Sequence, residues 1–91
     1  MKNEEKYIEI MNHYGYEAQI EQFIEECAEA IQAAQKCKRH RSKENLDHFH
    51  EEVADVIIMG TQMYNFLDTE KIDRIIEQKL DRQIERIRKE G

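Results

Sequence analysis

The sequence contains no proline and no tryptophan, and only three of its 91 residues are glycine. Proline and glycine mark most turns, so their scarcity argues against many short strands and favours a few long helices. No apolar run approaches the roughly 18 residues that a membrane-spanning helix requires. The polar start MKNEEKY does not resemble a signal peptide. These absences predict a soluble, cytoplasmic, all-α protein.

An excess of positive charge is also lacking, because the formal net charge is −6 at pH 7. Sequence-independent binding to DNA or RNA needs clustered Lys and Arg, so a nucleic-acid polymer is not an expected partner. A small phosphorylated ligand stays compatible, since metal ions invert the local charge. The length predicts one domain, residues 1–91. Such a domain buries only about 60% of its unfolded surface, so we expect it to gain stability as a homo-oligomer.

The two cysteines, Cys27 and Cys37, lie ten residues apart in one predicted helix. At about 1.5 Å per residue they are ~15 Å apart along its axis, too far for a disulfide. The chain has no C-x-x-C motif, so zinc is not expected. Two reduced thiols agree with a cytoplasmic location.

Four segments carry apolar residues at helical spacing. They are residues 3–14, 17–39, 43–67 and about 70–89. Gly15 is a suitable residue to end the first helix. Ser42 is the expected N-cap of the third helix, and Asp68 or Thr69 that of the fourth. We expect the four helices to form an antiparallel bundle.

The last three predicted helices each have an apolar stripe that we expect to face the core of the bundle. In the second helix it consists of Ile20, Phe23, Ile24, Cys27, Ile31 and Ala34. In the third it consists of Leu46, Phe49, Val53, Val56, Ile57, Gly60, Met63, Tyr64 and Leu67. In the fourth it consists of Ile72, Ile75, Ile76, Leu80, Ile84 and Ile87. Gly60 costs roughly 1 kcal/mol relative to Ala inside a helix, and we expect the close approach of a neighbouring helix to compensate.

One acidic phrase occurs twice: both copies fit F-x-E-E-x-A-[ED]-x-I, at residues 23–31 (FIEECAEAI) and 49–57 (FHEEVADVI). Residues three apart share a helix face, which pairs Glu26 with Glu29 and Glu52 with Asp55. Successive residues rotate by about 100°, so the two pairs lie at equivalent angles beside the apolar stripes of their helices. If the two helices pack antiparallel, the four carboxylates converge at an edge of the bundle.

Converging carboxylates repel one another and lose hydration, so such a cluster needs protons or cations. Oxygen ligands select hard divalent ions, which makes Mg²⁺ the expected metal and Mn²⁺ the alternative. A di-iron bundle needs Glu-x-x-His on two helices, and this chain has only one related spacing, Asp47 to His50. The four histidines are therefore expected at the surface: His13, His40, His48 and His50. Acidic pairs also occur simply as a solvated surface, and this alternative stays open.

Several polar residues are candidates for binding a phosphorylated ligand. Lys79, Arg82 and Arg86 share one stripe of the fourth helix, where they either contact a polyphosphate or form surface ion pairs. A second basic group lies at the connection between the second and third helices: Lys36, Lys38, Arg39 and Arg41. Gln19 lies two turns before Glu26 on the same face, where it either bonds a nucleotide base or is exposed.

The phrase EECAE, followed 22 residues after Glu29 by EEVAD, resembles the E-x-x-E, spacer, E-x-x-D signature of MazG-like nucleotide pyrophosphohydrolases. This all-α group also includes dimeric dUTPases and phosphoribosyl-ATP pyrophosphohydrolase, and the resemblance covers roughly residues 17–86. The resemblance implies a set of Mg²⁺ ligands and catalytic carboxylates, namely Glu26, Glu29, Glu52 and Asp55. It also implies that Lys79 and Arg82, a K-x-x-R pair, contact phosphates.

The reaction implied by this resemblance is attack of a metal-activated water between the α and β phosphates of a nucleoside triphosphate. The products are a monophosphate and pyrophosphate. Members of the group form dimers or tetramers with sites near subunit interfaces, so a homodimer or homotetramer is expected. Two alternatives stay open. One is the same fold acting on another phosphorylated nucleotide, such as phosphoribosyl-ATP, and the other is a non-catalytic helical interaction module.

Overall fold

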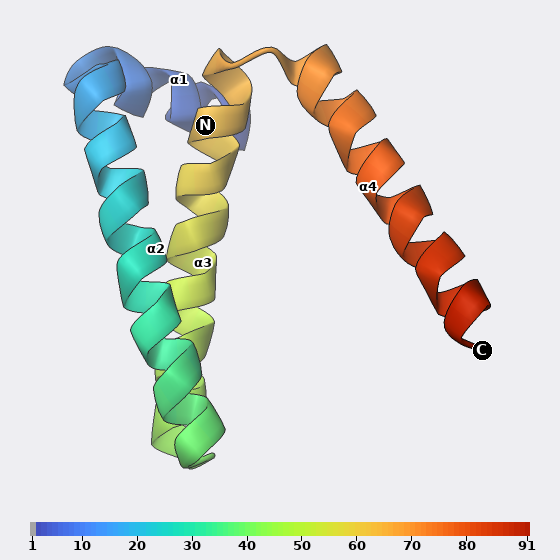
Figure 1. Cartoon of the computed structure of the whole chain (residues 1–91). Coiled ribbons are helices and arrows are strands. Elements are labelled where there is room, and N and C mark those ends of the chain that lie inside the picture. The colour runs from blue at the N-terminus through green and yellow to red at the C-terminus, as the bar shows by residue number, and fades with distance from the viewer. Residues whose placement is uncertain (1) are drawn as a thin grey trace.

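The computed structural model describes residues 2–91, which form four helices and no strand (Figure 1). The helices are α1 (Asn3–Tyr14), α2 (Tyr16–Arg39), α3 (Lys43–Phe66) and α4 (Thr69–Glu90). Every helix end lies within one residue of its predicted position, so the all-α prediction is confirmed. None of these four helices combines the length and the apolar character that a bilayer span requires.

The helix ends follow from local chemistry. Gly15 has a φ angle of 86°, a conformation that costs glycine little, and the chain breaks there between α1 and α2. Ser42 Oγ and Asp68 Oδ1 each accept a hydrogen bond from the backbone N–H group three residues later, at 3.0 and 3.1 Å. These bonds satisfy donors that the first turn of a helix leaves free. Of the two candidates for the last cap, Asp68 is the one used.

The body of the molecule is a hairpin in which α2 and α3 run antiparallel over most of their length (Figure 1). The buried apolar side chains are few, namely Ala33, Cys37, Met59 and Met63. Helix α1 packs on the end of the hairpin opposite the α2–α3 connection, where Gln62 Nε2 donates a hydrogen bond to the carbonyl oxygen of Tyr7 at 3.1 Å. Cys37 is buried and Cys27 half-buried, and both are free thiols, as predicted.

Helix α4 does not pack as predicted. It contacts α3 near their junction, where Tyr64 Oη donates to Asp73 Oδ1 at 2.8 Å, and then diverges from the hairpin (Figure 1). Its apolar stripe is exposed at all but one position, with exposed fractions for Ile75, Ile76, Leu80, Ile84 and Ile87 of 38, 48, 61, 46 and 59%. Only Ile72 is half-buried. The predicted inward packing of α4 is therefore wrong for the single chain, because only its first turns are tied to α3.

The predicted stripes of α2 and α3 are also only partly buried. Their exposed members are Ile20, Ile24, Ile31, Val53, Ile57 and Leu67. The two helices meet instead along the polar edge of each stripe, which buries Gln19, Glu52 and Gln62. A Cβ atom added to Gly60 would meet no atom of another helix within 4 Å. The close approach predicted for Gly60 is thus absent within one chain.

Candidate functional site

Three of the four predicted carboxylates come together between α2 and α3. Glu26, Glu52 and Asp55 each place a carboxylate oxygen within 4.8 Å of the others, and we call them the carboxylate cluster. Glu26 lies on the contact edge of α2, while Glu52 and Asp55 lie one turn apart on the contact edge of α3. Glu29 is exposed and stands outside the cluster, although its charge acts on both Glu26 and Glu52.

The cluster is short of hydrogen-bond partners. Glu52 is 8% exposed, and Glu26 and Asp55 are half-buried. Glu26 Oε1 accepts a hydrogen bond from Gln22 Nε2 at 2.7 Å, and His48 Nε2 lies 3.9 Å from Glu52 Oε1. The second oxygens of Glu26 and Glu52 are buried and have no partner among the described residues. A buried carboxylate oxygen without a partner is costly, so this arrangement favours a bound proton or cation.

The electrostatic environment of the cluster also favours a bound proton or cation. Burial is the main cause that raises the pKa of Glu26, and the charges of Asp55 and Glu29 raise it further, against the opposing hydrogen bond from Gln22. Burial likewise raises the pKa of Glu52, followed by the charge of Glu29, with His48 opposing. Both carboxylates are therefore destabilised in their charged form, and a divalent cation between them removes that penalty.

The donor set suits a hard divalent ion. Its members supply carboxylate oxygens only, from two helices, and Mg²⁺ and Mn²⁺ prefer such ligands. All four histidines are exposed, as predicted.

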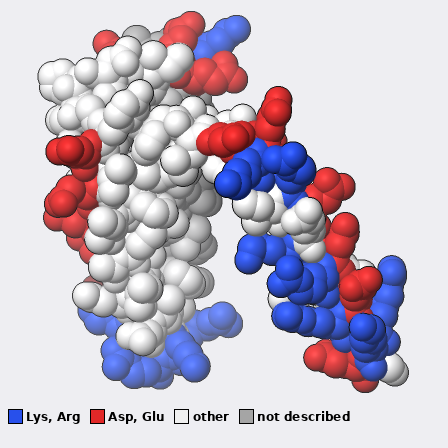
Figure 2. Space-filling model, turned by 45° about the horizontal axis from the view of Figure 1, so that its top comes forward, with Lys and Arg blue, Asp and Glu red and all other residues white. Residues whose placement is uncertain are grey.

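A groove adjoins the cluster on the side toward the α2–α3 connection, and we call it the basic groove. Its volume is about 440 Å³, and its walls include Glu29 and Glu52 at one end and Lys36 and Arg39 at the other. Lys and Arg side chains gather at this end of the hairpin in Figure 2. The predicted second basic group is divided by the fold. Lys36 and Arg39 line the basic groove, whereas Lys38 and Arg41 line a separate depression with Phe49.

A second groove lies on the other side of the cluster, beneath α1. Its volume is about 410 Å³, and Ile10 and Tyr14 of α1 face Gln19, Met59 and Gln62 across it. Gln19 is only 5% exposed, so the alternative that it is a surface residue is wrong. Its Oε1 atom accepts a hydrogen bond from Gln62 Nε2 at 3.2 Å.

Sequence reasoning missed Gln22 and Gln62. Gln22 precedes Glu26 by one turn, and Gln62 follows Asp55 by two turns on the same face of α3. The carboxylates were identified from helical spacing. The same spacing could have indicated these two amides.

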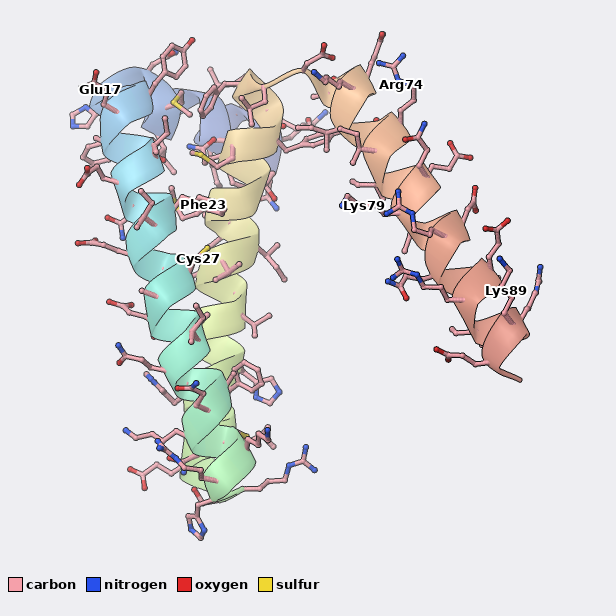
Figure 3. All side chains as sticks on the ribbon, viewed as in Figure 1. Glu17, Phe23, Cys27, Arg74, Lys79 and Lys89 are labelled. Carbon is pink, nitrogen blue, oxygen red and sulfur yellow. The ribbon has the colours of Figure 1, made fainter. Side chains whose placement is uncertain are left out.

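The third predicted group, Lys79, Arg82 and Arg86, lies on α4 and is exposed. Figure 3 shows Lys79 on the diverging helix, away from Phe23 and Cys27 of α2. The basic groove is lined by α2 and α3 residues alone. A single chain therefore does not bring these three cations to the carboxylate cluster.

Comparisons with family models, with curated proteins and with solved structures found no match to this chain.

Proposed function

We propose that this chain is a cytoplasmic, Mg²⁺-dependent nucleoside triphosphate pyrophosphohydrolase of the MazG-like kind, acting as a homo-oligomer. One observation carries the proposal. Glu26, Glu52 and Asp55 converge with two buried oxygens that have no partner, directly beside a groove that ends in Lys36 and Arg39. Mg²⁺ with a polyphosphate needs this combination of carboxylate oxygens for the metal and cations for the remaining phosphate charge.

Each part of the site has a distinct task in this proposal. Glu26, Glu52 and Asp55 would hold the metal. Mg²⁺ at this position would neutralise phosphate charge and lower the pKa of a bound water. Glu29, which is exposed at the edge of the basic groove, takes the proton from the attacking water. The water oxygen forms a new bond to phosphorus as the α–β anhydride bond breaks, and the bond electrons leave with pyrophosphate.

The two grooves define the orientation of the bound nucleotide. Lys36 and Arg39 bind the terminal phosphates in the basic groove. The nucleoside then lies under α1, where the second groove offers apolar side chains and the amide of Gln19. An apolar pocket with few polar groups is typical of a base-binding site. Lys79, Arg82 and Arg86 stay predicted phosphate contacts that require α4 to approach the site.

The test is release of pyrophosphate from a panel of NTPs, dNTPs and phosphoribosyl-ATP by the purified chain with Mg²⁺. We expect activity in the wild type and a loss of at least about 100-fold in Glu52→Gln and Asp55→Asn. Glu51→Gln is the matched control, because Glu51 is the neighbouring acid and is exposed. If no substrate releases pyrophosphate, or if Glu52→Gln retains wild-type rates, the proposal fails.

A non-catalytic interaction module is the second candidate, favoured by the exposed isoleucines of α2, α3 and α4. The response of the melting temperature to Mg²⁺ distinguishes the enzyme from the interaction module. For the enzyme, Mg²⁺ bound at the carboxylate cluster should raise the melting temperature. For a module whose acids only face solvent, Mg²⁺ should not change it.

A further inference from the structure

The side-chain amide of Gln19 is held in one orientation. Gln62 Nε2 lies 3.1 Å from the carbonyl oxygen of Tyr7, which can only accept a hydrogen bond, so the Gln62 atom at this position is the amide nitrogen. The same nitrogen lies 3.2 Å from Gln19 Oε1. Turning the Gln19 amide by 180° would place its nitrogen there instead, with two donors facing each other. Gln62 therefore fixes which end of the Gln19 amide is free.

The free end is the nitrogen. Among the described residues, Gln19 Nε2 donates no hydrogen bond, yet it is not one of the buried atoms without a partner, which are the second oxygens of Glu26 and Glu52. The nitrogen therefore keeps some exposed surface although Gln19 is only 5% exposed as a whole. Because Gln19 lines the second groove, it offers this groove a donor and no acceptor.

Gln22 lines the same groove and is oriented from the opposite side. Its Nε2 donates to Glu26 Oε1 at 2.7 Å, and an ionised carboxylate only accepts hydrogen bonds. The nitrogen of Gln22 thus points to the carboxylate cluster, which leaves its Oε1 as the acceptor for a ligand. The α2 wall of the groove therefore carries an acceptor near the cluster and a donor farther from it.

The spacing along α2 suits a nucleotide whose phosphates lie at the cluster. Gln22 precedes Glu26 by four residues and Gln19 precedes it by seven, which places them ~6 and ~10 Å away along the helix axis. The sugar then lies nearest the cluster, and the edge of the base meets Gln22 first and Gln19 last. Ile58 and Met59 of α3 supply apolar contacts for the base in a groove of about 410 Å³.

We propose that Gln19 and Gln22 select nucleotides whose base has a carbonyl group at position 4 of a pyrimidine or position 6 of a purine. Uracil, thymine, guanine and hypoxanthine are bases of this kind. Their carbonyl oxygen, on the edge far from the sugar, accepts a hydrogen bond from Gln19 Nε2. The adjacent ring N–H donates to Gln22 Oε1. The inference rests on the proposed function, which places the phosphates at the cluster.

Cytosine and adenine present the reverse pattern to the same two amides. They carry an amino group at this position and an unprotonated nitrogen beside it in the ring. The amino group meets the donor of Gln19, and the ring nitrogen meets the acceptor of Gln22. Gln19 cannot turn to accept from the amino group, because Gln62 holds its Oε1. Gln62, which is 2% exposed, is thus a positioning residue that acts through Gln19.

Pyrophosphate release from two matched pairs of substrates tests the proposal. UTP and CTP differ at position 4 and its adjacent ring nitrogen, and ITP and ATP differ at position 6 in the same way. We expect kcat/KM of the wild type to be at least about tenfold higher for UTP and for ITP, since the other member of each pair leaves polar groups unpaired. Equal values within either pair overturn the proposal, whereas pyrophosphate release itself upholds the proposed function.

Variants of the two glutamines test the assignment of roles. Gln19→Glu keeps the shape of the side chain and replaces the donor by an acceptor, so it should lower the UTP-to-CTP ratio of kcat/KM at least about tenfold. Gln78→Glu adds the same charge at an exposed position of α4 and should keep the wild-type ratio. Gln62→Leu frees the amide of Gln19 to rotate and should move the ratio toward one. Both substrates are measured on one preparation, so the folded fraction does not affect the ratio. A wild-type ratio in Gln19→Glu overturns the proposal.

Binding without catalysis distinguishes this inference from the proposed function. UMP and CMP are titrated in EDTA into the ¹⁵N-labelled full chain, and the side-chain NH₂ signals of Gln19 are followed by NMR. We expect UMP to shift these signals and to bind at least about tenfold more tightly than CMP. If no triphosphate is hydrolysed but UMP is preferred, the proposed function fails and the preference of the groove stands. Equal affinities, or no binding of either nucleotide, overturn the inference.

Discussion

Glu26 and Glu52 lie 26 residues apart at the same position of the repeated phrase, and each buries one carboxylate oxygen without a hydrogen-bond partner in a single cluster. The antiparallel hairpin brings the two copies of the phrase together. Burial raises the pKa of both residues. The hairpin thus maintains an arrangement that is unfavourable for two charged carboxylates unless a proton or a cation joins them.

Mg²⁺ or Mn²⁺ is therefore expected to stabilise the folded chain. A free metal concentration 100-fold above the dissociation constant adds about 2.7 kcal/mol to the free energy of unfolding. Thermal melts with and without metal measure this effect in the wild type, in Asp55→Asn and in the exposed control Glu51→Gln. We expect Glu51→Gln to respond like the wild type and Asp55→Asn to respond weakly. An equal response in all three contradicts a metal site at the cluster.

In the absence of divalent metal, stability is expected to depend on pH through Glu26 and Glu52. Because burial raises their pKa above the ordinary value of 4.5, the folded state holds these protons more tightly than the unfolded state. Their contribution is fully present below pH 4.5 and is lost as the pH rises through the raised pKa. Glu52→Gln should thus gain stability relative to the wild type over that window. Urea unfolding in EDTA at a series of pH values measures the difference, and a difference that does not vary with pH contradicts the prediction.

Gln62 joins α1 to the hairpin, so its replacement is expected to loosen α1. Gln62 Nε2 bonds both the Tyr7 carbonyl and Gln19 Oε1, and Gln62 is only 2% exposed. Gln62→Leu leaves both acceptors without a donor, at a cost of about 1–3 kcal/mol. Relative to the wild type, Gln62→Leu should accelerate hydrogen exchange in α1 more than in α3. Asn65→Ala, at an exposed position on the same helix, is the control. Unchanged protection of α1 in Gln62→Leu speaks against this role.

The basic groove is expected to set the affinity for phosphates. Lys36→Ala and Arg39→Ala remove the two cations that line it, and each should raise KM about tenfold with a smaller effect on kcat. Lys38→Ala is the matched control, since Lys38 lines the separate depression with Phe49. Steady-state pyrophosphate release gives both constants. If Lys38→Ala raises KM as much as Lys36→Ala does, the effect comes from the change in net charge. That result contradicts a specific role for the basic groove.

Helical periodicity in the sequence was enough to predict the carboxylates of the candidate site, but not all of its residues. The repeat placed the pair Glu26 and Glu29 at angles equivalent to those of Glu52 and Asp55. Of these four residues, Glu26, Glu52 and Asp55 converge. The same reasoning included Glu29, which is exposed and lines the basic groove together with Glu52. It also left Gln19 undecided and gave no role to Gln62, because their burial depends on where α1 crosses the hairpin.

The sequence by itself determined the four helices and their ends, because capping residues, glycine and periodic apolar residues act over one or two turns. It also determined which residues share a face of each helix. Only the tertiary structure decided which face meets which neighbour. The α2–α3 contact runs along the edge that carries Ala33 and Cys37, where small side chains permit close packing, and the larger isoleucines stay outside. The apolar stripe of α4 is predicted from the sequence to be buried in a core. Within one chain, however, no other helix packs against this stripe.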